Sequence, residues 1–127
     1  MNPLGASAAL LIGSVSALYL EVPEQMLTIY EESLLAAQQV MTAGDMHSMS
    51  VMLGARYIMD RNLPAEDQFE DWLRQAFQEN NIKDLAIDHW GRPYLYRLSD
   101  DRRTYQLSSL GPDGVAGTSD DMSIHGP

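Results

Sequence analysis

The sequence predicts an α+β fold in which a long N-terminal helix packs its lower half on a small antiparallel sheet of two or three strands, with a second short helix. Three observations predict it. Helical hydrophobic periodicity runs through residues 23–59 and again through residues 65–80. Alternating strand patterns follow at residues 93–98 and 104–108. Glycines and a proline then mark residues 109–122 as a loop.

Length and composition limit the possible functions. At 127 residues the chain is long enough for one domain with a modest core. A net charge of −10 and a pI near 4.4 argue against nucleic acid and anionic membrane surfaces as partners. The absence of cysteine excludes disulfides, zinc–thiolate sites and a thiol nucleophile. No arrangement of a nucleophile with a base, and no phosphate loop, is found, so we expect no enzymatic activity.

The first segment, residues 1–24, is predicted to be an apolar helix in a membrane or a filament core. Residues 4–20 carry no charge and would span roughly 25 Å as a helix, slightly less than the ~30 Å hydrocarbon core of a bilayer. Small residues recur every fourth position, which lets neighbouring helices approach closely in an apolar medium. These residues are Gly5, Ala9, Gly13 and Ala17.

Two other interpretations of this segment remain open. A cleaved signal peptide would use Val15-Ser16-Ala17 as its small-residue site, but no Lys or Arg precedes the apolar run. A buried helix of a soluble protein is also possible, although apolar residues on both faces are unusual for one.

The second segment, residues 25–127, is predicted to continue the helix and then to form a globular domain. Pro23 interrupts or kinks the helix at its start. An amphipathic stripe then runs to Met59, with a weak point at Gly44. The stripe is formed by Leu27, Tyr30, Leu34, Ala37, Met41, Met46, Met49 and Leu53.

The second helix and the hairpin have simpler signals. Phe69, Trp72 and Leu73 begin an amphipathic pattern over residues 65–80, and the acids that open it favour a helix N-terminus. Residues 99–103 are expected to connect the two strands as a hairpin. Before the first strand, we expect Trp90 to plug the core, its indole N–H bonded to a backbone carbonyl.

The loop at residues 109–122 carries three carboxylates, Asp113, Asp120 and Asp121, and no Lys or Arg follows Arg103. Like charges in one tight loop repel each other unless a cation lies between them. Ca²⁺ is the cation that carboxylates and loop carbonyls suit best, because it accepts six to eight oxygens in flexible geometry. A solvated acidic turn is the alternative, and the spacing does not fit an EF-hand.

Two motifs together resemble a known family. The run Asp88-His89-Trp90-Gly91-Arg92-Pro93-Tyr94, and the run Ser109-Leu110-Gly111-Pro112-Asp113-Gly114 with the acids after it, resemble the C-terminal half of the major pseudopilin of type II secretion, the G subunit. The likeness covers about residues 43–121. The N-terminus is divergent, because the family's Phe-Thr-Leu-x-Glu start is replaced by Leu4-Gly5-Ala6.

The resemblance implies a pilin-like fold with a C-terminal calcium loop. It implies a structural subunit of a secretion pseudopilus or a type IV pilus-like filament, stabilised by Ca²⁺. Partners would be further copies of the chain, other pilin-like subunits, an inner-membrane assembly platform and the membrane itself through the N-terminal helix. The location would be the bacterial inner membrane with a periplasmic domain, or a cell-surface filament. The ligands it implies are the side chains of Asp113, Asp120 and Asp121 and the carbonyls of Leu110 and Val115.

A second function stays open at this point. A membrane-tethered or secreted calcium-dependent binding module would present the same loop to a ligand. Self-assembly separates the two functions, because a filament subunit polymerises through its apolar helix and a binding module does not.

Overall fold

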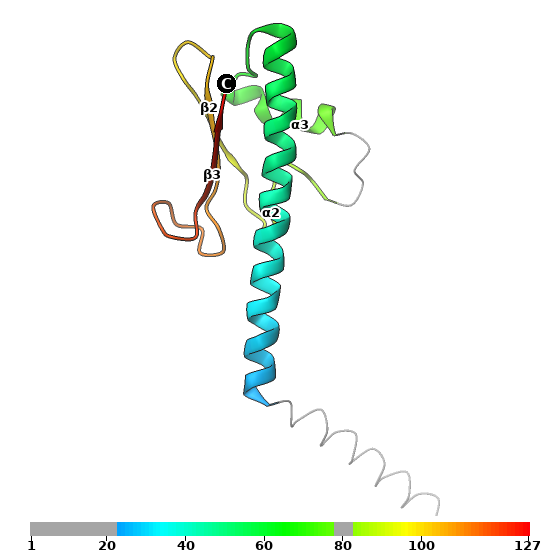
Figure 1. The fold of residues 1–127 in the computed structure, drawn as a ribbon, viewed down its shortest axis with the longest axis vertical. Coiled ribbons are helices and arrows are strands. Elements are labelled where there is room, and N and C mark those ends of the chain that lie inside the picture. The colour runs from blue at the N-terminus through cyan, green and yellow to red at the C-terminus, as the bar shows by residue number, and fades with distance from the viewer. Residues whose placement is uncertain (1–22, 78–82) are drawn as a thin grey trace, which may run out of the picture. The chain divides into compact units, whose positions relative to one another are not determined.

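The computed structural model describes residues 23–77 and 83–127. Its first described element is helix α2, Glu24–Asp60 (Figure 1). This confirms the predicted long helix, which continues through Gly44 without interruption. Arg61 follows the helix with a φ of 56°, and its N–H donates to the Tyr57 carbonyl, so the chain leaves the helix through the left-handed region.

The predicted apolar stripe of α2 is buried only in its second half. Met46, Met49 and Leu53 have an exposed fraction of 1% or less, and they point into the core. The earlier members do not, since Leu27 and Tyr30 are 52% and 66% exposed. This agrees with the expectation that only the lower half of the helix packs on the sheet. The physical reason is that the packed unit begins only at Leu35.

The second helix is shorter than predicted and opens with a tighter turn. A 3₁₀ turn, η1, covers Glu66–Gln68, and helix α3 covers Phe69–Ala76. The last predicted residues, 78–80, lie outside the described part of the chain. Within α3, Arg74 contacts Glu70 at 3.4 Å, which confirms the expected pairing across one helical turn.

Three antiparallel strands form a sheet in the order β1-β2-β3. Strand β1 is Leu95–Leu98, β2 is Tyr105–Ser109 and β3 is Met122–Gly126. The first two strands confirm the predicted hairpin, in which the Ser99 N–H donates to the Thr104 carbonyl. The third strand follows the acidic loop and pairs beside β2 (Figure 1). These elements confirm the α+β, pilin-like fold class.

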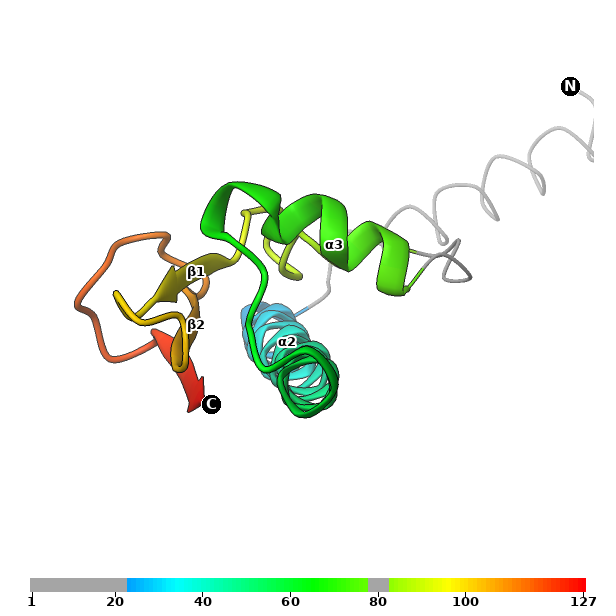
Figure 2. The same cartoon turned by 90° about the horizontal axis from the view of Figure 1, so that it is seen from above.

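The core of the unit that begins at Leu35 lies between the second half of α2, α3 and one face of the sheet (Figure 2). Period-two alternation places Tyr96 and Leu107 on this face and Arg97 and Gln106 on the other. The ring of Phe69 stacks on Tyr96 with centroids 4.0 Å apart. The core is formed by Met46, Met49, Leu53, Leu63, Phe69, Leu73, Ala86, Tyr94, Tyr96, Tyr105 and Leu107.

Trp90 does not occupy the place expected of it. It is half-buried rather than a core plug, and among the described residues its indole Nε1 has no hydrogen-bond partner. The neighbouring acid takes the buried position instead, because Asp88 is only 2% exposed. The turn at residues 88–92 is therefore built around a carboxylate and not around an indole ring.

The predicted apolar helix at residues 4–20, and with it the boundary after residue 24, lies outside the described residues. Among the described helices, none combines the length and apolar character that a membrane span requires. The division into residues 1–24 and 25–127 stays a prediction.

Candidate metal centre

The pairing of β2 with β3 brings the two ends of the acidic loop together. Ser109 lies opposite Met122 in the register, so the intervening residues must turn back on themselves. Gly111 makes this closure possible, because it has a φ of 67° and its backbone passes the Asp120 carbonyl. A Cβ at this position would lie 2.5 Å from that carbonyl oxygen, so the crossing has no space for a side chain.

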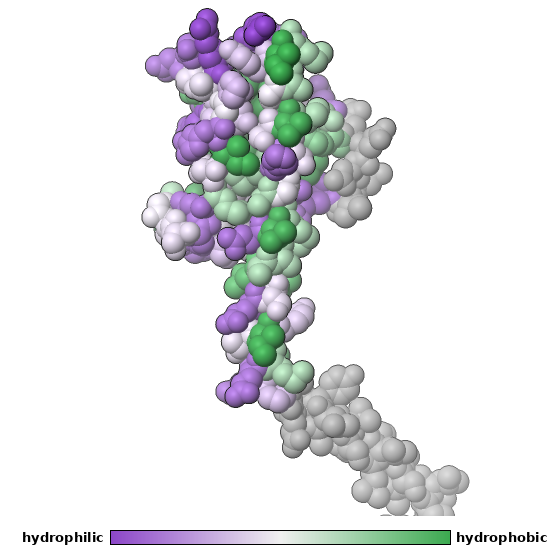
Figure 3. All heavy atoms as spheres, viewed as in Figure 1, coloured by the Kyte–Doolittle hydropathy of each residue, from purple (hydrophilic) through white to green (hydrophobic). Residues whose placement is uncertain are grey.

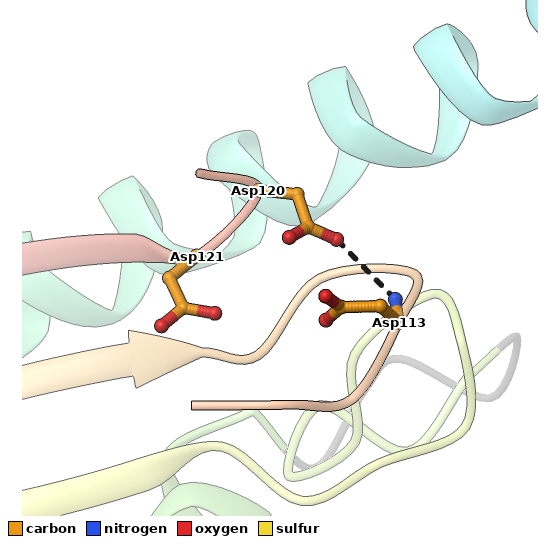
Figure 4. Close-up of side chains that lie close together, drawn as sticks. All are labelled: Asp113, Asp120 and Asp121. Carbon is orange, nitrogen blue, oxygen red and sulfur yellow. Dashed lines mark hydrogen bonds between the residues drawn. The ribbon is translucent and has the colours of Figure 1, made fainter. Parts of the chain in front are cut away.

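The loop brings the three predicted carboxylates into one cluster. Asp113, Asp120 and Asp121 each offer one oxygen, and these oxygens lie within 4.8 Å of one another (Figure 4). Oxygens bound to a single Ca²⁺ lie at most about 5 Å apart, since each bond measures about 2.3–2.6 Å. The spacing and the chemistry of the donors therefore fit this ion.

Each carboxylate also accepts a hydrogen bond from the loop's own backbone. Asp113 accepts from the Val115 N–H at 2.9 Å, and Asp120 accepts from the Asp113 N–H at 3.3 Å (Figure 4). Asp121 accepts from the Gly117 N–H at 2.6 Å. These bonds fix the carboxylates without neutralising them. A carboxylate has about four acceptor positions, so each retains capacity for a cation.

Thr118 lies among these oxygens, although no sequence pattern marks it as part of the site. Its hydroxyl oxygen is 3.0 Å from the Val115 carbonyl, 3.2 Å from Asp121 Oδ1 and also close to Asp120 Oδ1. One hydroxyl has one proton, so it can satisfy only one of the three acceptors at a time. The cluster is therefore richer in acceptors than in donors, as expected of a cation site.

The hydrogen bonds of the loop favour the ionised form of Asp120. The hydrogen bond from Thr118 lowers the pKa of Asp120 below its ordinary value of 3.8, and the bond from the Asp113 N–H lowers it further. Within residues 23–77 and 83–127, no Lys or Arg forms an ion pair with Asp113, Asp120 or Asp121. The repulsion between the three charges is thus not relieved by a side-chain cation.

The turn at residues 88–92 holds the entrance of the loop. Asp88 Oδ1 accepts from the N–H groups of Trp90 and Arg92, at 3.0 and 2.9 Å. Asp88 Oδ2 accepts from the Ser109 hydroxyl at 2.8 Å, and Ser109 in turn accepts from the Gly111 N–H. One buried carboxylate thus joins the turn before β1 to the end of β2.

Two side chains of helix α2 hold the turn at residues 88–92 in position. The hydroxyl of Thr42, a fully buried polar residue of α2, accepts from the His89 N–H at 3.2 Å. Gln38, one turn earlier, donates to the His89 carbonyl at 3.1 Å. The sequence signal for this contact was weak, since a lone Thr on a helix face is usually solvent-exposed.

A position near the carboxylate cluster is established for one of the two predicted carbonyl ligands. The Val115 carbonyl lies beside the cluster, through its contact with Thr118. The assignment of the Leu110 carbonyl stays a prediction, and so does the ligand set as a whole.

Comparisons with known proteins agree with this combination of fold and loop. The family model described as Type II secretion system (T2SS), protein G matches residues 31–126. The chain is 41% identical over 49 residues to type II secretion system core protein G of Escherichia coli K12. It is 36% identical over 53 residues to the protein of the same name from Pseudomonas aeruginosa. These segments cover 39% and 42% of this chain.

The chain spans about a third of the length of these curated relatives, since the matched segments cover 34% of each. No solved structure matches it significantly. The family model, in contrast, extends from the third turn of α2 through β3 and so covers most of the chain. The chain therefore belongs to the type II secretion system protein G family.

Proposed function

We propose that this protein is a structural subunit of a type II secretion pseudopilus, with a carboxylate loop that binds Ca²⁺. The observation that carries the proposal is the family match over residues 31–126, which includes the long helix, the sheet and the loop. Its partners would be further copies of the chain, other pilin-like subunits and an inner-membrane assembly platform. The globular domain would face the periplasm, with the apolar N-terminal segment in the membrane or the filament core.

The exposed apolar surface of α2 supports a subunit that associates with other helices. Side chains on the face opposite the buried Met46, Met49 and Leu53 are 57–71% exposed, and apolar residues recur along the helix (Figure 3). In a filament, apolar side chains exposed along one helix can be buried against a helix of the neighbouring subunit. The row is formed by Met26, Ile29, Val40, Val51 and Ile58.

The geometry of the loop supports calcium as the bound ion. Three carboxylate oxygens lie within 4.8 Å of one another, and the Val115 carbonyl is nearby. When bound, Ca²⁺ would supply positive charge that cancels the repulsion between the carboxylates, and it would crosslink the two ends of the loop. Its role in this proposal is structural, since it would hold β3 beside β2.

Assembly tests the proposal most directly. Val40→Glu places a charge in the middle of the exposed row, at a site that is 71% exposed and therefore unimportant for folding. The matched control is Gln106→Glu, which adds the same charge on the exposed face of the sheet. We expect wild-type chain and control to form filaments, judged by pelleting and electron microscopy, and Val40→Glu to form far fewer.

If all three chains assembled equally, the exposed row of α2 would not be part of the contact surface between subunits. A wild-type chain that remains monomeric in the presence of the assembly machinery, but binds a soluble ligand with calcium, would instead identify a calcium-dependent binding module.

A further inference from the structure

Arg92 links the turn at residues 88–92 to the acidic loop at residues 109–122. Its Nη1 donates to the Gly111 carbonyl at 2.7 Å, and its Nη2 donates to the Pro112 carbonyl at 3.2 Å. Those two peptide groups come directly before Asp113. A guanidinium is a planar fork, so two bonds from its two ends fix the orientation of both carbonyls at once. The first turn of the acidic loop is thus shaped by a residue about twenty positions upstream.

The loop leaves space for this side chain and for nothing more. Gly114 has a φ of 68°, and a Cβ at this position would lie 2.4 Å from Nε of Arg92. The backbone after Asp113 therefore passes directly over the guanidinium. The positive φ favours glycine here, and a side chain at this position would also displace the guanidinium of Arg92. The loop's first turn is wrapped around Arg92.

Arg92 is itself held firmly. Its N–H donates to the Asp88 carboxylate at 2.9 Å, and its carbonyl accepts from the Asp88 N–H at 2.8 Å. Asp88 is 2% exposed and also binds Ser109, where the loop begins. The anchor of the guanidinium is therefore a buried, hydrogen-bonded turn, and it does not depend on an ion in the loop.

A cation at this place can affect calcium binding in two opposite ways. Its positive charge competes with Ca²⁺ for the field of the three carboxylates, which lowers the affinity. Its hydrogen bonds hold the loop in the shape in which the carboxylates converge, which raises the affinity because less order must be gained on binding. The contacts favour the second effect. The guanidinium binds backbone carbonyls, and in the described structure it forms no ion pair with Asp113, Asp120 or Asp121.

We propose that Arg92 is the positioning residue of the calcium loop. It holds the first turn in its folded shape before the ion arrives, and it thereby strengthens calcium binding although it is itself a cation. This inference rests on the proposed calcium function. It gives a physical reason for the presence of both motifs in one chain, because the turn at residues 88–92 carries the side chain around which the carboxylate loop closes.

Three variants of the 127-residue chain, solubilised in mild detergent, separate the two effects. Arg92→Met removes the charge and the hydrogen bonds but keeps an unbranched stem. Arg92→Lys keeps the charge and loses the fork. Arg97→Met is the matched control, because it removes the same charge from an exposed side chain on β1. Calcium affinity is measured by titration calorimetry well below the melting temperature, and amide hydrogen exchange of residues 109–122 is measured in chelator.

We expect Arg92→Met to weaken calcium binding about tenfold, which corresponds to about 1.4 kcal/mol. Arg92→Lys should also bind more weakly than wild type, by a smaller factor, and Arg97→Met should bind as wild type does. In chelator, exchange of the loop amides should become faster in Arg92→Met and remain unchanged in Arg97→Met. A role in global stability alone would lower the melting temperature and leave the affinity unchanged.

Tighter binding by Arg92→Met, with Arg92→Lys equal to wild type, would overturn the proposal and make Arg92 a competing charge. Unchanged affinity and unchanged exchange would overturn it as well. The failure of the calcium function itself is distinguishable, because wild-type chain would then give no heat of binding. In that case the affinity claim fails with it, and only the exchange measurement in chelator decides whether Arg92 holds the loop.

Discussion

Two groups of acidic side chains in this protein carry similar charge and have different surroundings. The first group opens the second helix, where Glu66 accepts from the Leu98 N–H at 2.9 Å and lies 3.8 Å from Arg97. In the same group Glu70 and Asp71 both contact Arg74, at 3.4 and 3.6 Å. Cations of the same chain lie beside these acids.

The second group is the cluster of Asp113, Asp120 and Asp121. Its oxygens converge within 4.8 Å, and the groups they contact are backbone N–H groups and one hydroxyl. The difference teaches that the number of acids does not define a metal site. Convergence without a countercharge defines it, because only then does an added cation gain more than it costs to dehydrate. The predictions below test this difference, from the largest expected effect to the smallest.

The severest test removes the support of the loop and leaves every acid of both groups in place. Asp88→Ala deletes the acceptor of two backbone N–H groups and of the Ser109 hydroxyl. Because the Ser109 hydroxyl is buried and the two N–H groups are partly buried, we expect the free energy of unfolding to fall by about 3 kcal/mol, measured by urea unfolding. Asp88→Asn keeps an oxygen acceptor and should cost about 1 kcal/mol. Equal losses for the two variants would show that the charge of Asp88, and not its geometry, supports the loop.

Calcium should stabilise the fold through the loop acids and not through the acids of the second helix. The expected effect on the free energy of unfolding is almost as large as that of Asp88→Ala. At a free concentration one hundred times the dissociation constant, binding would stabilise the fold by about 2.7 kcal/mol. For a packed unit of this size that corresponds to a rise of several degrees in the melting temperature. Asp113→Ala should abolish the rise, and Glu66→Ala should retain it. Magnesium should replace calcium poorly, since it demands a tighter octahedron. An identical melting curve in calcium and in chelator would reduce the loop to a solvated acidic turn.

The helix group should respond to mutation without responding to calcium. Glu66→Ala leaves the Leu98 N–H without its acceptor at the edge of the sheet, and we expect a loss of about 1 kcal/mol in calcium and in chelator alike. Glu66→Gln keeps an acceptor oxygen and should lose less. A loss that appears only in calcium would mean that the helix acids are coupled to the loop.

Much of the fold was predictable because it depends on local periodicity. The helix of α2 and the β1–β2 hairpin follow directly from apolar spacing and alternation. Apolar spacing does not by itself distinguish Leu27, which is exposed, from Met46, which is buried. The burial of the lower half followed instead from the predicted packing of the helix on the sheet. The predicted fold allowed for a third strand but did not locate it, because the five residues of β3 pair with β2 only after the loop has closed.

In the candidate site, too, some features were predictable from the sequence and others were not. The convergence of the three carboxylates could be expected from the sequence, since the three acids lie in one short glycine-rich loop. Asp88, Arg92 and Thr118 were not identified as part of it. Their roles arise from contacts across long sequence distances or from one shared hydroxyl, and neither leaves a periodic signal. Trp90 was expected in the core because its side chain is large and apolar, whereas the smaller side chain of Asp88 occupies the buried position.

The smallest expected effect concerns Asp101, which serves as an internal control for the loop acids. It lies in the hairpin at residues 99–103 and accepts from the Ser99 hydroxyl at 2.7 Å and from the Arg103 N–H at 3.1 Å. These are the two kinds of donor that Asp120 has. The hydrogen bond from Ser99 lowers the pKa of Asp101 below 3.8, with a further contribution from the Arg103 N–H.

A depressed pKa in the folded state stabilises the fold above the unfolded pKa of 3.8, and this stabilisation is lost as the pH falls through the lower folded value. We therefore expect the Asp101 carboxyl, followed by NMR between pH 2 and 6 in chelator, to titrate below its ordinary range, and Ser99→Ala to move it back. Added calcium at neutral pH should shift the carboxyl resonances of Asp113, Asp120 and Asp121 and leave that of Asp101 in place. If calcium shifted all four resonances alike, local hydrogen bonding would suffice to attract the ion weakly, and the convergence of the loop carboxylates would have no special role.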